Sequence, residues 1–547
     1  MATVSVPQKR SPGYSAVMSW ITTVDHKKIG IMYMTMAFTF FIVAGLMAML
    51  IRLELLAPGQ QFITASFYNQ MFTMHASAMI FLFIFPFFAG LANYIVPLQI
   101  GALDMAFPRL NALALWMTVF GGLLVLAGFV TPGGAAAAGW TAYPPLSGRT
   151  FSPNLGMDFW ILGVQVIGAG SLMGAVNFLV TIANMRAPGM TWRRLPLFVW
   201  TVLTAQVMVL AATPMLTGAL VMLLTDRQFG TRFFDAAQGN PRLWQHMFWF
   251  YSHPAVYIMI LPAMGIVSEA LQVFSRKPIF GYVVLVVSTV CIAFLGFTTW
   301  LHHMFTIGSN PAVEALFMLT TIVIAVPTGV KIFNWIATIW GGSLDFKTPL
   351  LFSMGFLATF LVGGISGVFQ GSVPLDQQLH DTYWVVAHLH YVLFGGSVFG
   401  IFAGVYYWWP KFTGRMYHEK LGQWTFWLLF AGMNLTFFPM HILGLMGMPR
   451  RYVDYPADRG WEIHNIMATM GVFVIAIGVL VFFISLFATI RSQPAGDDPW
   501  EANTLEWATS SPPPAHNFDR IPPITSERPL WDLRLEQRSG SSSPWRR

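Results

Sequence analysis

Three observations predict an all-α integral membrane protein, a bundle of twelve transmembrane helices. Of the 547 residues, 55% are hydrophobic and only 10% are charged, whereas soluble globular proteins carry about 25% charged residues. Apolar runs of about 20 residues, the length that crosses a bilayer as a helix, recur from one end of the chain to the other. The connections between these runs leave no room for a soluble domain.

The twelve predicted helices are the apolar runs, read in chain order. Several exceed the length that a bilayer requires, so we expect them to tilt or to extend beyond the membrane. Their approximate ranges are 30–51, 67–97, 109–131, 158–184, 195–225, 243–274, 280–304, 311–340, 349–371, 383–409, 421–446 and 463–490.

Two polar segments flank the predicted helical domain, which spans residues 30–490. Residues 1–29 contain no apolar run of the length that a cleavable signal needs, so the first helix is expected to direct the chain to the membrane. Residues 491–547 are rich in proline, serine and charge, a composition typical of loosely ordered tails. The single cysteine, Cys291, excludes an internal disulfide and any metal site that needs several cysteines.

The distribution of lysine and arginine predicts the orientation in the membrane. With the N-terminus inside, the inner segments before and between the helices hold fourteen of these residues and the outer loops hold eight. Because basic residues favour the cytoplasmic side, both termini are predicted to be cytoplasmic. The net charge of +7 requires no nucleic-acid partner, since the basic residues lie in short loops and in the tail.

Six of the thirteen histidines fall within or at the ends of the apolar runs. For the predicted topology, all six lie in the outer half of the membrane. One such histidine alone would be read as a hydrogen-bonded core residue, but buried histidines in hydrocarbon are costly, and six at one depth indicate metal binding. They are His75, His253, His302, His303, His388 and His390.

The spacing of these histidines predicts more than one metal centre. His388 and His390 are two residues apart, so on a helix their side chains lie about 200° apart and face two different centres. His302 and His303 are adjacent and about 100° apart, which allows both to bind one metal at a helix end. Imidazole suits iron, copper and zinc.

Two further histidines complete this arrangement. His253 offers a third nitrogen to the metal of the adjacent pair, and His75 closes the far side of one of the other two centres, as in a six-coordinate haem. The second haem would then keep an open face toward a three-histidine copper. Such a site would bind and reduce a small diatomic molecule.

The sequence resembles subunit I of the haem–copper terminal oxidases of the cytochrome c oxidase type, over nearly all of residues 20–490. The matching motifs include the histidines and the segments around them. They are His253-Pro254-Ala255-Val256-Tyr257, Trp300-Leu301-His302-His303-Met304-Phe305, Pro327-Thr328-Gly329-Val330-Lys331, His380-Asp381-Thr382-Tyr383, His388-Leu389-His390, Met448-Pro449-Arg450-Arg451-Tyr452, the stretch Asp104–Asn111 and the stretch Gly139–Pro145.

The resemblance implies a helical bundle that encloses two haems and a copper ion, with one role for each ligand. It assigns His75 and His390 to a low-spin haem a, His388 to a high-spin haem, and His253, His302 and His303 to copper B. It also implies that Tyr257 is covalently linked to His253 and supplies an electron and a proton during O–O cleavage. Positions i and i+4 share one helix face, in agreement with that link.

The resemblance also implies two proton-uptake routes. Lys331 is the centre of one, with Thr328 and Ser268 nearby. A buried lysine needs water, a partner or a shifted pKa, and Lys331 is too far from either helix end to reach the membrane surface. The mouth of the second route is formed by Asp104, Asn93 and Asn111, which alone would be read as a loop acid and two helix-end amides.

Further residues are implied to hold the cofactors from the outer side. The fixed fork of arginine suits carboxylate binding, so the resemblance assigns haem propionates to Arg450, Arg451 and Trp140, and a substituent of the low-spin haem to Arg52. His380 and Asp381 are expected to bind a magnesium ion completed by another subunit. Glu54 is a candidate for a peripheral calcium or sodium site.

One position departs from the pattern of many family members. They carry glutamate two residues after the first copper ligand, where this chain has Ala255, so the second proton route lacks its usual terminal acid. The residues before His253 are Tyr251 and Ser252, as in some bacterial members. We expect their hydroxyls to relay protons in place of the glutamate.

The predicted protein is therefore the catalytic subunit of a terminal oxidase in a bacterial plasma membrane. It would reduce dioxygen to water and pump protons. The resemblance implies a subunit II with a dinuclear copper centre, a subunit III, and cytochrome c as donor. A quinol oxidase with the same core is the alternative. A nitric oxide reductase is disfavoured by Tyr257 and Lys331. A transporter with a polar path would leave the paired histidines unexplained.

Overall fold

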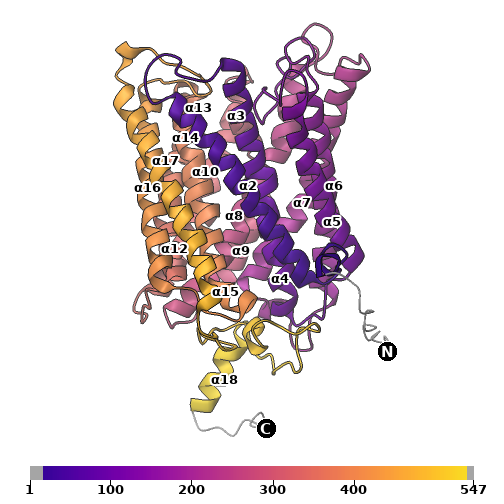
Figure 1. Cartoon of the computed structure of the whole chain (residues 1–547), viewed down its shortest axis with the longest axis vertical. Coiled ribbons are helices and arrows are strands. Elements are labelled where there is room, and N and C mark those ends of the chain that lie inside the picture. The colour runs from indigo at the N-terminus through magenta and orange to yellow at the C-terminus, as the bar shows by residue number, and fades with distance from the viewer. Residues whose placement is uncertain (1–15, 539–547) are drawn as a thin grey trace.

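The computed structural model describes residues 16–538. Within this range the chain forms a helical bundle with isolated β-bridges and no β-strand (Figure 1). The α-helices are α1 Ala16–Ile21, α2 His26–Glu54, α3 Ala65–Ala78, α4 Phe85–Ile100, α5 Pro108–Ala127, α6 Gly156–Asn184, α7 Leu197–Gln228, α8 Pro241–Phe274, α9 Tyr282–Gly296, α10 Pro311–Val323, α11 Ala325–Ile339, α12 Thr348–Gly371, α13 Val373–Leu379, α14 Tyr383–Val392, α15 Phe399–Thr413, α16 Glu419–Leu445, α17 Glu462–Ala488 and α18 Pro529–Arg538.

Eleven continuous helical segments of the described chain have the length and apolarity needed to cross a membrane. Three of them join two named helices: Ala65–Ile100, Pro311–Ile339 and Tyr383–Thr413. The remaining predicted span, 280–304, forms the shorter apolar helix α9, and a 3₁₀ turn at Trp300–His303 follows it after a short break. The predicted bundle is confirmed, and the break explains why one span falls below the usual length.

Two of the long segments contain π-helical turns. One turn, Met79–Ile84, separates α3 from α4, and the other, Leu393–Val398, separates α14 from α15. Each turn begins within four residues after a predicted haem ligand, His75 or His390. Such turns carry an extra residue and occur frequently at functional sites.

The ends of the bundle differ in what covers them. Helix α2 begins at the same end at which α18 and the C-terminal segment lie, and α3 and α14 begin at the opposite end (Figure 1). The six predicted ligands therefore lie in the half of the bundle away from the C-terminal segment. Residues 1–15 and 539–547, which belong to the two predicted polar segments, are outside the described range.

The expectation of a loosely ordered tail is wrong for residues 492–538. This segment packs against the helix ends at which α2 begins, which the predicted topology places inside, and it buries Trp500, Leu505 and Trp507. Its aromatic side chains contact the bundle, as the indole of Trp507 donates a hydrogen bond to the Tyr407 hydroxyl at 3.2 Å. The composition suggested disorder because proline and serine are abundant, but the few large apolar residues supply enough burial to hold the segment.

Glu506 anchors this C-terminal segment inside the protein. Its Oε1 accepts hydrogen bonds from the Gln99 amide at 3.1 Å and from the Trp408 indole at 3.0 Å. The residue is fully buried, and burial raises the pKa of its carboxyl. The tail is thus joined to the helices by a polar contact as well as by apolar packing.

Candidate metal and proton-transfer site

Three histidines from two separate parts of the chain converge on one point. His253 lies within α8, and His302 and His303 lie on the 3₁₀ turn after α9. The His303 Nε2 atom is 3.1 Å from His253 Nδ1 and 3.1 Å from His302 Nε2. Among the described residues this is the one group of three or more possible metal-ligand side chains that meet closely enough to bind a single ion.

Neighbouring side chains hold the three imidazoles in this orientation. Trp249 stacks on His303 with ring centroids 3.8 Å apart and planes 8° apart, and its indole donates to the Tyr143 hydroxyl at 2.5 Å. The His302 nitrogen that faces away from the other two histidines, Nδ1, lies 3.0 Å from the Thr321 hydroxyl. Hydrogen bonds to the second ring nitrogen of a histidine fix which nitrogen points at a metal. Trp249, Tyr143 and Thr321 were not predicted from the sequence, because neither their type nor their spacing distinguishes them.

Tyr257 lies one helical turn after His253 and faces it. The two ring centroids are 4.8 Å apart, and His253 Nε2 is buried without a hydrogen-bond partner. The backbone of Gly296, at the end of α9, lets the tyrosine ring approach, since a Cβ there would lie 2.8 Å from Tyr257 Cδ2. The predicted side-by-side placement of His253 and Tyr257 is present, and Gly296 is a further residue that makes it possible.

His75 and His390 form a second site. Their rings are nearly parallel, 14° apart, with centroids separated by 6.3 Å. His75 Nδ1 lies 2.8 Å from the Ala44 carbonyl, and His390 Nδ1 lies 2.8 Å from the Val386 carbonyl. A carbonyl only accepts, so Nδ1 carries the proton in each ring and Nε2 is free to bind a metal. The two free Nε2 atoms would hold one haem iron between the rings.

His388 faces a different neighbourhood from His390, as the two-residue spacing predicts. Its Nδ1 lies 2.9 Å from the Gly363 carbonyl and 3.1 Å from the Ser366 hydroxyl, which again leaves Nε2 free. On α12, Gly367 packs against His388, and Gly371, four residues later, packs against Thr321, which contacts His302. A Cβ at Gly367 would lie 2.7 Å from His388 Cε1. This arrangement fits a second haem beside the three-histidine group.

Arg52 is buried with part of its guanidinium unpartnered. Its Nη2 donates to the Asn465 carbonyl at 3.0 Å and to the Asn465 side-chain oxygen at 2.9 Å. Its Nε and Nη1 atoms are buried with no partner from the protein. Because a buried charged donor normally has a partner, this orphaned edge supports a polar substituent of a bound group beside it.

The two arginines of the outer loop have different surroundings. Arg450 Nε donates to Asp381 Oδ1 at 2.7 Å. Arg451 has no carboxylate pair within the described chain, and burial together with Arg450 lowers its pKa to about 10. Its guanidinium lies beside Gly139, next to Trp140. A half-buried cation without a counter-ion fits the expected propionate contact.

Lys331 is buried and has hydrogen-bond partners that the sequence did not indicate. It is 2% exposed, and its Nζ donates to the Thr289 hydroxyl at 2.6 Å and to the Leu285 carbonyl at 3.3 Å. Thr328, one turn earlier, donates to the Ile324 carbonyl. Thr289 was missed because one threonine in an apolar helix carries no distinguishing signal.

Ser268 contacts a neighbour of Lys331 on α11. Its hydroxyl accepts a 2.9 Å hydrogen bond from the indole of Trp335, which is four residues after Lys331 on the same face of α11. Thr289, Lys331 and Ser268 lie on α9, α11 and α8, and the place of Ser268 in a proton route stays a prediction.

Two of the three residues predicted for the mouth of the second route, Asn93 on α4 and Asn111 on α5, contact each other. The Asn111 side chain donates to Asn93 Oδ1 at 2.6 Å. Asp104 lies in the loop before α5, where burial raises the pKa of its carboxyl to about 6. The sequence did not indicate the role of His26, whose Nδ1 lies 2.6 Å from the Asn93 carbonyl.

Ala255, Tyr251 and Ser252 lie in the same turns of α8 as His253. All three are buried. The hydroxyl of Ser252 has no hydrogen-bond partner from the protein. An unpartnered buried hydroxyl is the kind of group that ordered water satisfies, so the polar atom that the prediction requires is present at this depth.

The predicted cation positions are engaged by protein groups. His380 Nδ1 lies 2.9 Å from Asp376 Oδ2, and Asp381 is paired with Arg450. Glu54 accepts backbone N–H bonds from residues 61, 62 and 63, which folds the loop after α2. The magnesium and the calcium or sodium expectations stay predictions.

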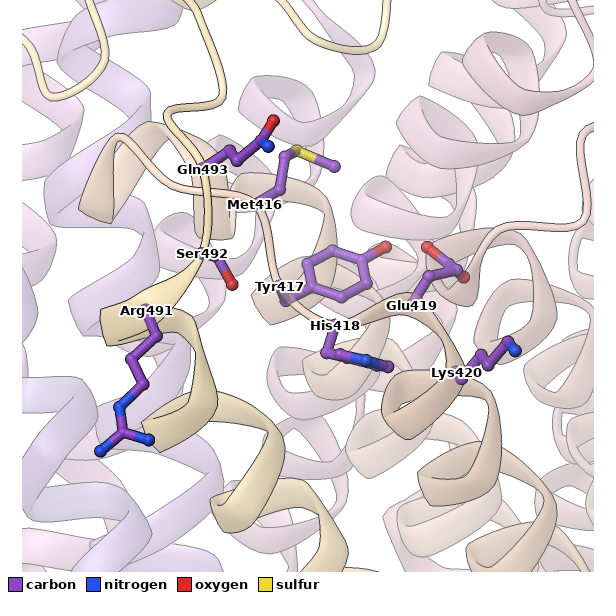
Figure 2. Close-up of a pocket in the computed structure, with 8 residues that line it drawn as sticks. All are labelled: Met416, Tyr417, His418, Glu419, Lys420, Arg491, Ser492 and Gln493. Atoms are coloured by element: carbon purple, nitrogen blue, oxygen red, sulfur yellow. The ribbon is translucent and has the colours of Figure 1, made fainter.

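A surface hollow of about 430 Å³ lies at the inner end of the bundle, between the start of α16 and the end of α17 (Figure 2). Its lining includes His418, Lys420 and Arg491. Figure 2 shows these three side chains pointing in different directions. They do not converge on one ligand, and the hollow is separate from the histidine centres in the outer half.

Known proteins share both the sequence and the fold. The family model described as cytochrome c and quinol oxidase polypeptide I matches residues 28–505. A Streptomyces coelicolor protein is 53% identical over 521 residues, covering 95% of this chain and 91% of its own length. "Cytochrome c oxidase subunit 1" is 49% identical in Corynebacterium glutamicum, covering 96% of this chain and 91% of the relative, and 47% identical in Bacillus subtilis, covering 98% and 86%.

A solved structure shares the architecture at lower identity. The chain aligns with a haem–copper terminal oxidase dimer with a TM-score of 0.73 and 21% identity, covering 86% of this chain and 84% of the other. At this identity the likeness concerns the fold alone.

Proposed function

The chain belongs to the cytochrome c and quinol oxidase polypeptide I family, and from this premise we propose how its residues carry out oxygen reduction. It is the membrane-embedded catalytic subunit of a haem–copper oxidase, an oxidoreductase that works with other subunits such as subunit II. We propose that it takes electrons from cytochrome c, reduces dioxygen to water and pumps protons. The convergence of His253, His302 and His303 on one point is the observation that carries this proposal.

The residues fit the cofactors of the family. His75 and His390 would hold the low-spin haem, His388 the high-spin haem, and the three-histidine group copper B. When bound, these groups supply electron transfer and the binding and reduction of dioxygen. The protein fixes the tautomer of each haem-binding histidine through a backbone carbonyl that keeps the proton on Nδ1. These carbonyls belong to Ala44 for His75, Val386 for His390 and Gly363 for His388.

Tyr257 is proposed as the residue that gives an electron and a proton to the reaction. His253 uses Nδ1 toward the metal group and leaves Nε2 unpartnered, on a ring that faces the tyrosine. We propose that this nitrogen is the atom covalently linked to Tyr257. The link would hold the phenol beside the site at which oxygen binds.

Two groups of polar residues are proposed to deliver protons. Lys331, with Thr289, Thr328 and Ser268, offers hydrogen-bond donors and acceptors for one route. Asp104 with the Asn93–Asn111 pair offers the mouth of a second route. A carboxyl with a pKa near the working pH gains and loses a proton easily, and the Asp104 pKa of about 6 suits this task.

Tyr251 and Ser252 are proposed to complete the second route in place of a glutamate. Both lie on α8 near Ala255, and the Ser252 hydroxyl lacks a protein partner. Loss of proton pumping in a Tyr251→Phe, Ser252→Ala double variant is the expected result. Unchanged pumping stoichiometry in that variant would contradict this part of the proposal.

The remaining cofactors and partners are proposed from the relatives and from the sequence. We propose haem a at both iron sites and propionate binding by Arg450, Arg451 and Trp140. A magnesium ion at His380 and Asp381 would be shared with another subunit, and a subunit II with dinuclear copper would pass on the electrons. We place the complex in a bacterial plasma membrane, with both termini cytoplasmic.

A quinol donor is the second candidate, because the matching family model includes quinol oxidases. The relatives that are 47–49% identical are named cytochrome c oxidases, which favours cytochrome c. The rate of oxygen consumption with reduced cytochrome c and with a reduced quinol, measured on the same purified complex, separates the two.

The proposed cofactor content is tested by spectroscopy of the purified complex. A reduced-minus-oxidised spectrum with and without carbon monoxide, pyridine haem extraction and copper analysis are expected to give two haems per chain, one of which binds carbon monoxide, and copper. The extracted haem names its type. A folded, membrane-inserted preparation that lacks haem after expression with haem available would overturn the assignment.

A further inference from the structure

One oxygen of the Glu506 carboxyl has no hydrogen-bond donor. Oε1 accepts from the Gln99 amide and from the Trp408 indole, whereas Oε2 is buried and makes no hydrogen bond with the described residues. The side-chain oxygen of Gln99, Oε1, is likewise buried without a partner. Both side chains are completely enclosed. Two buried acceptors on the same pair of side chains are therefore left without a donor.

A single proton on Glu506 Oε2 would satisfy both oxygens. A carboxylic acid and a primary amide can pair through two hydrogen bonds, because each offers one donor and one acceptor on the same side. The first of these bonds is present, from the Gln99 amide to Glu506 Oε1 at 3.1 Å. An ionised carboxylate only accepts, and a buried charge without a partner is costly. The neutral acid therefore suits this place better than the ionised one.

No lysine or arginine of the described chain donates to Glu506. Lys411, at the end of α15, lies 5.0 Å from the centre of the Trp507 ring, next to Glu506 in the chain. An ammonium group has three N–H donors, and those of Lys411 are engaged by three backbone carbonyls of the C-terminal segment. These carbonyls belong to Asp497 at 3.2 Å, Thr509 at 2.8 Å and Ser510 at 3.3 Å.

The other titratable groups of this region do not neutralise Glu506. Glu269, a buried acid of α8, accepts from the Phe198 backbone N–H at 3.3 Å, and the Phe198 ring contacts Trp408 with centroids 5.4 Å apart. The remaining groups have partners of their own: the Tyr407 hydroxyl of α15 accepts from Trp507, and Asp498 of the C-terminal segment lies 3.4 Å from Arg534. An ionised Glu506 would add a second buried acid without adding a cation.

We propose that Glu506 and Gln99 form a buried proton-binding site, which holds the C-terminal segment, residues 492–538, against the bundle at neutral pH. The proton is carried by Glu506 Oε2 and is donated to Gln99 Oε1. When the segment leaves the bundle, the carboxyl enters water and releases the proton. Docking of the segment therefore takes up one proton, and a more alkaline solution on this side of the membrane weakens it.

The direction of the pH dependence follows from the two states of the carboxyl. In the docked segment, burial raises the pKa of Glu506 above its ordinary value of 4.5. Between these two pKa values the docked form keeps a proton that the undocked form has lost, so the docking constant falls about tenfold for each pH unit. Above the raised pKa the fall ends. Glu506→Gln retains both hydrogen bonds to Gln99 without a titrating group, so this variant should stay docked at every pH.

The test follows amide hydrogen exchange of residues 500–510 in the purified oxidase complex, from about pH 5 to about pH 9. Exchange of a synthetic peptide of the same sequence, measured at each pH, removes the intrinsic dependence of the rates on pH. We expect protection in the wild type to fall with rising pH relative to Glu506→Gln. The matched control is Glu501→Gln, which changes an exposed glutamate of the same segment and should keep the wild-type pH dependence.

A second variant and a second measurement test the position of the proton. The Thr504 hydroxyl is buried without a partner two residues before Glu506, so it is the competing donor for an ionised carboxylate. Thr504→Val should keep wild-type protection, and its loss at every pH would overturn the inference. The infrared difference between wild type and Glu506→Gln at neutral pH should contain the carbonyl stretch of a protonated carboxyl group.

Three further outcomes would overturn the inference. They are the absence of that carbonyl band, a wild-type protection that follows Glu506→Gln at every pH, and a Glu506→Gln complex that fails to assemble with native haem spectra. The last outcome counts against the proposal because glutamine reproduces the hydrogen bonds of the neutral acid and lacks only the charge of the ionised one.

Discussion

The contact between Gly296 and Tyr257 allows a sharp prediction. In Gly296→Ala, the new methyl group would lie 2.8 Å from Tyr257 Cδ2 and 3.2 Å from Cε2. Carbon atoms in contact are normally about 3.5 Å or more apart, so the ring must move by about 0.7 Å. That movement displaces the phenol relative to His253, whose ring centroid is now 4.8 Å away.

The expected result is a loss of turnover with a folded protein. Overpacking of this size costs about 1–3 kcal/mol of stability, and a misplacement approaching 1 Å at a reacting group costs up to about a hundredfold in rate. We expect oxygen consumption to fall between about tenfold and a hundredfold, with native haem content. Mass spectrometry should also show less of the linked His253–Tyr257 peptide, which has two hydrogens fewer than the unlinked pair.

The matched control is Gly174→Ala in α6, where an added Cβ meets no atom within 4 Å. It should keep native turnover and a native amount of linked peptide. Native turnover and native linkage in Gly296→Ala would refute the argument that this glycine positions Tyr257.

Three further predictions concern other parts of the site. Gly367→Ala places a methyl group 2.7 Å from His388 Cε1 and should reduce carbon monoxide binding while the low-spin haem spectrum stays native; unchanged carbon monoxide binding would contradict it. Thr289→Val removes the hydroxyl that accepts the 2.6 Å hydrogen bond from Lys331 and should slow high-spin haem reduction in stopped flow by about fivefold, whereas Thr289→Ser should stay near native. Burial raises the Asp104 pKa from 3.8 to about 6, so the folded protein favours the protonated carboxyl. The thermal stability of the wild type relative to Asp104→Asn should therefore fall as pH rises from about 4 to about 6. A stability difference that does not change with pH in scanning fluorimetry would refute this.

The sequence allowed the bundle and the cluster of three histidines to be predicted because both have strong physical signatures. Long apolar runs require helices in a membrane, and histidines in such runs are costly unless they bind something. The i, i+2 spacing of His388 and His390 correctly placed the two rings in different surroundings. The i, i+4 spacing correctly placed Tyr257 beside His253.

Other features depend on contacts between distant segments and have no local signature. Gly296 and Gly367 resemble any glycine in a membrane helix until the partner ring is known. Thr289 becomes distinctive only when α9 and α11 bring it to Lys331. The π-helical turns after His75 and His390 leave no recognisable pattern, and the tail composition concealed the few large side chains that attach it to the bundle.

The contacts of Glu506 with Gln99 and Trp408 join the C-terminal segment to helices that precede it in the chain by 407 and 98 residues. Both helices are synthesised before the segment, so the surface that receives it is built from chain that has already left the ribosome. The segment can dock only after α4 and α15 have come together, and its docking is therefore a late step of assembly.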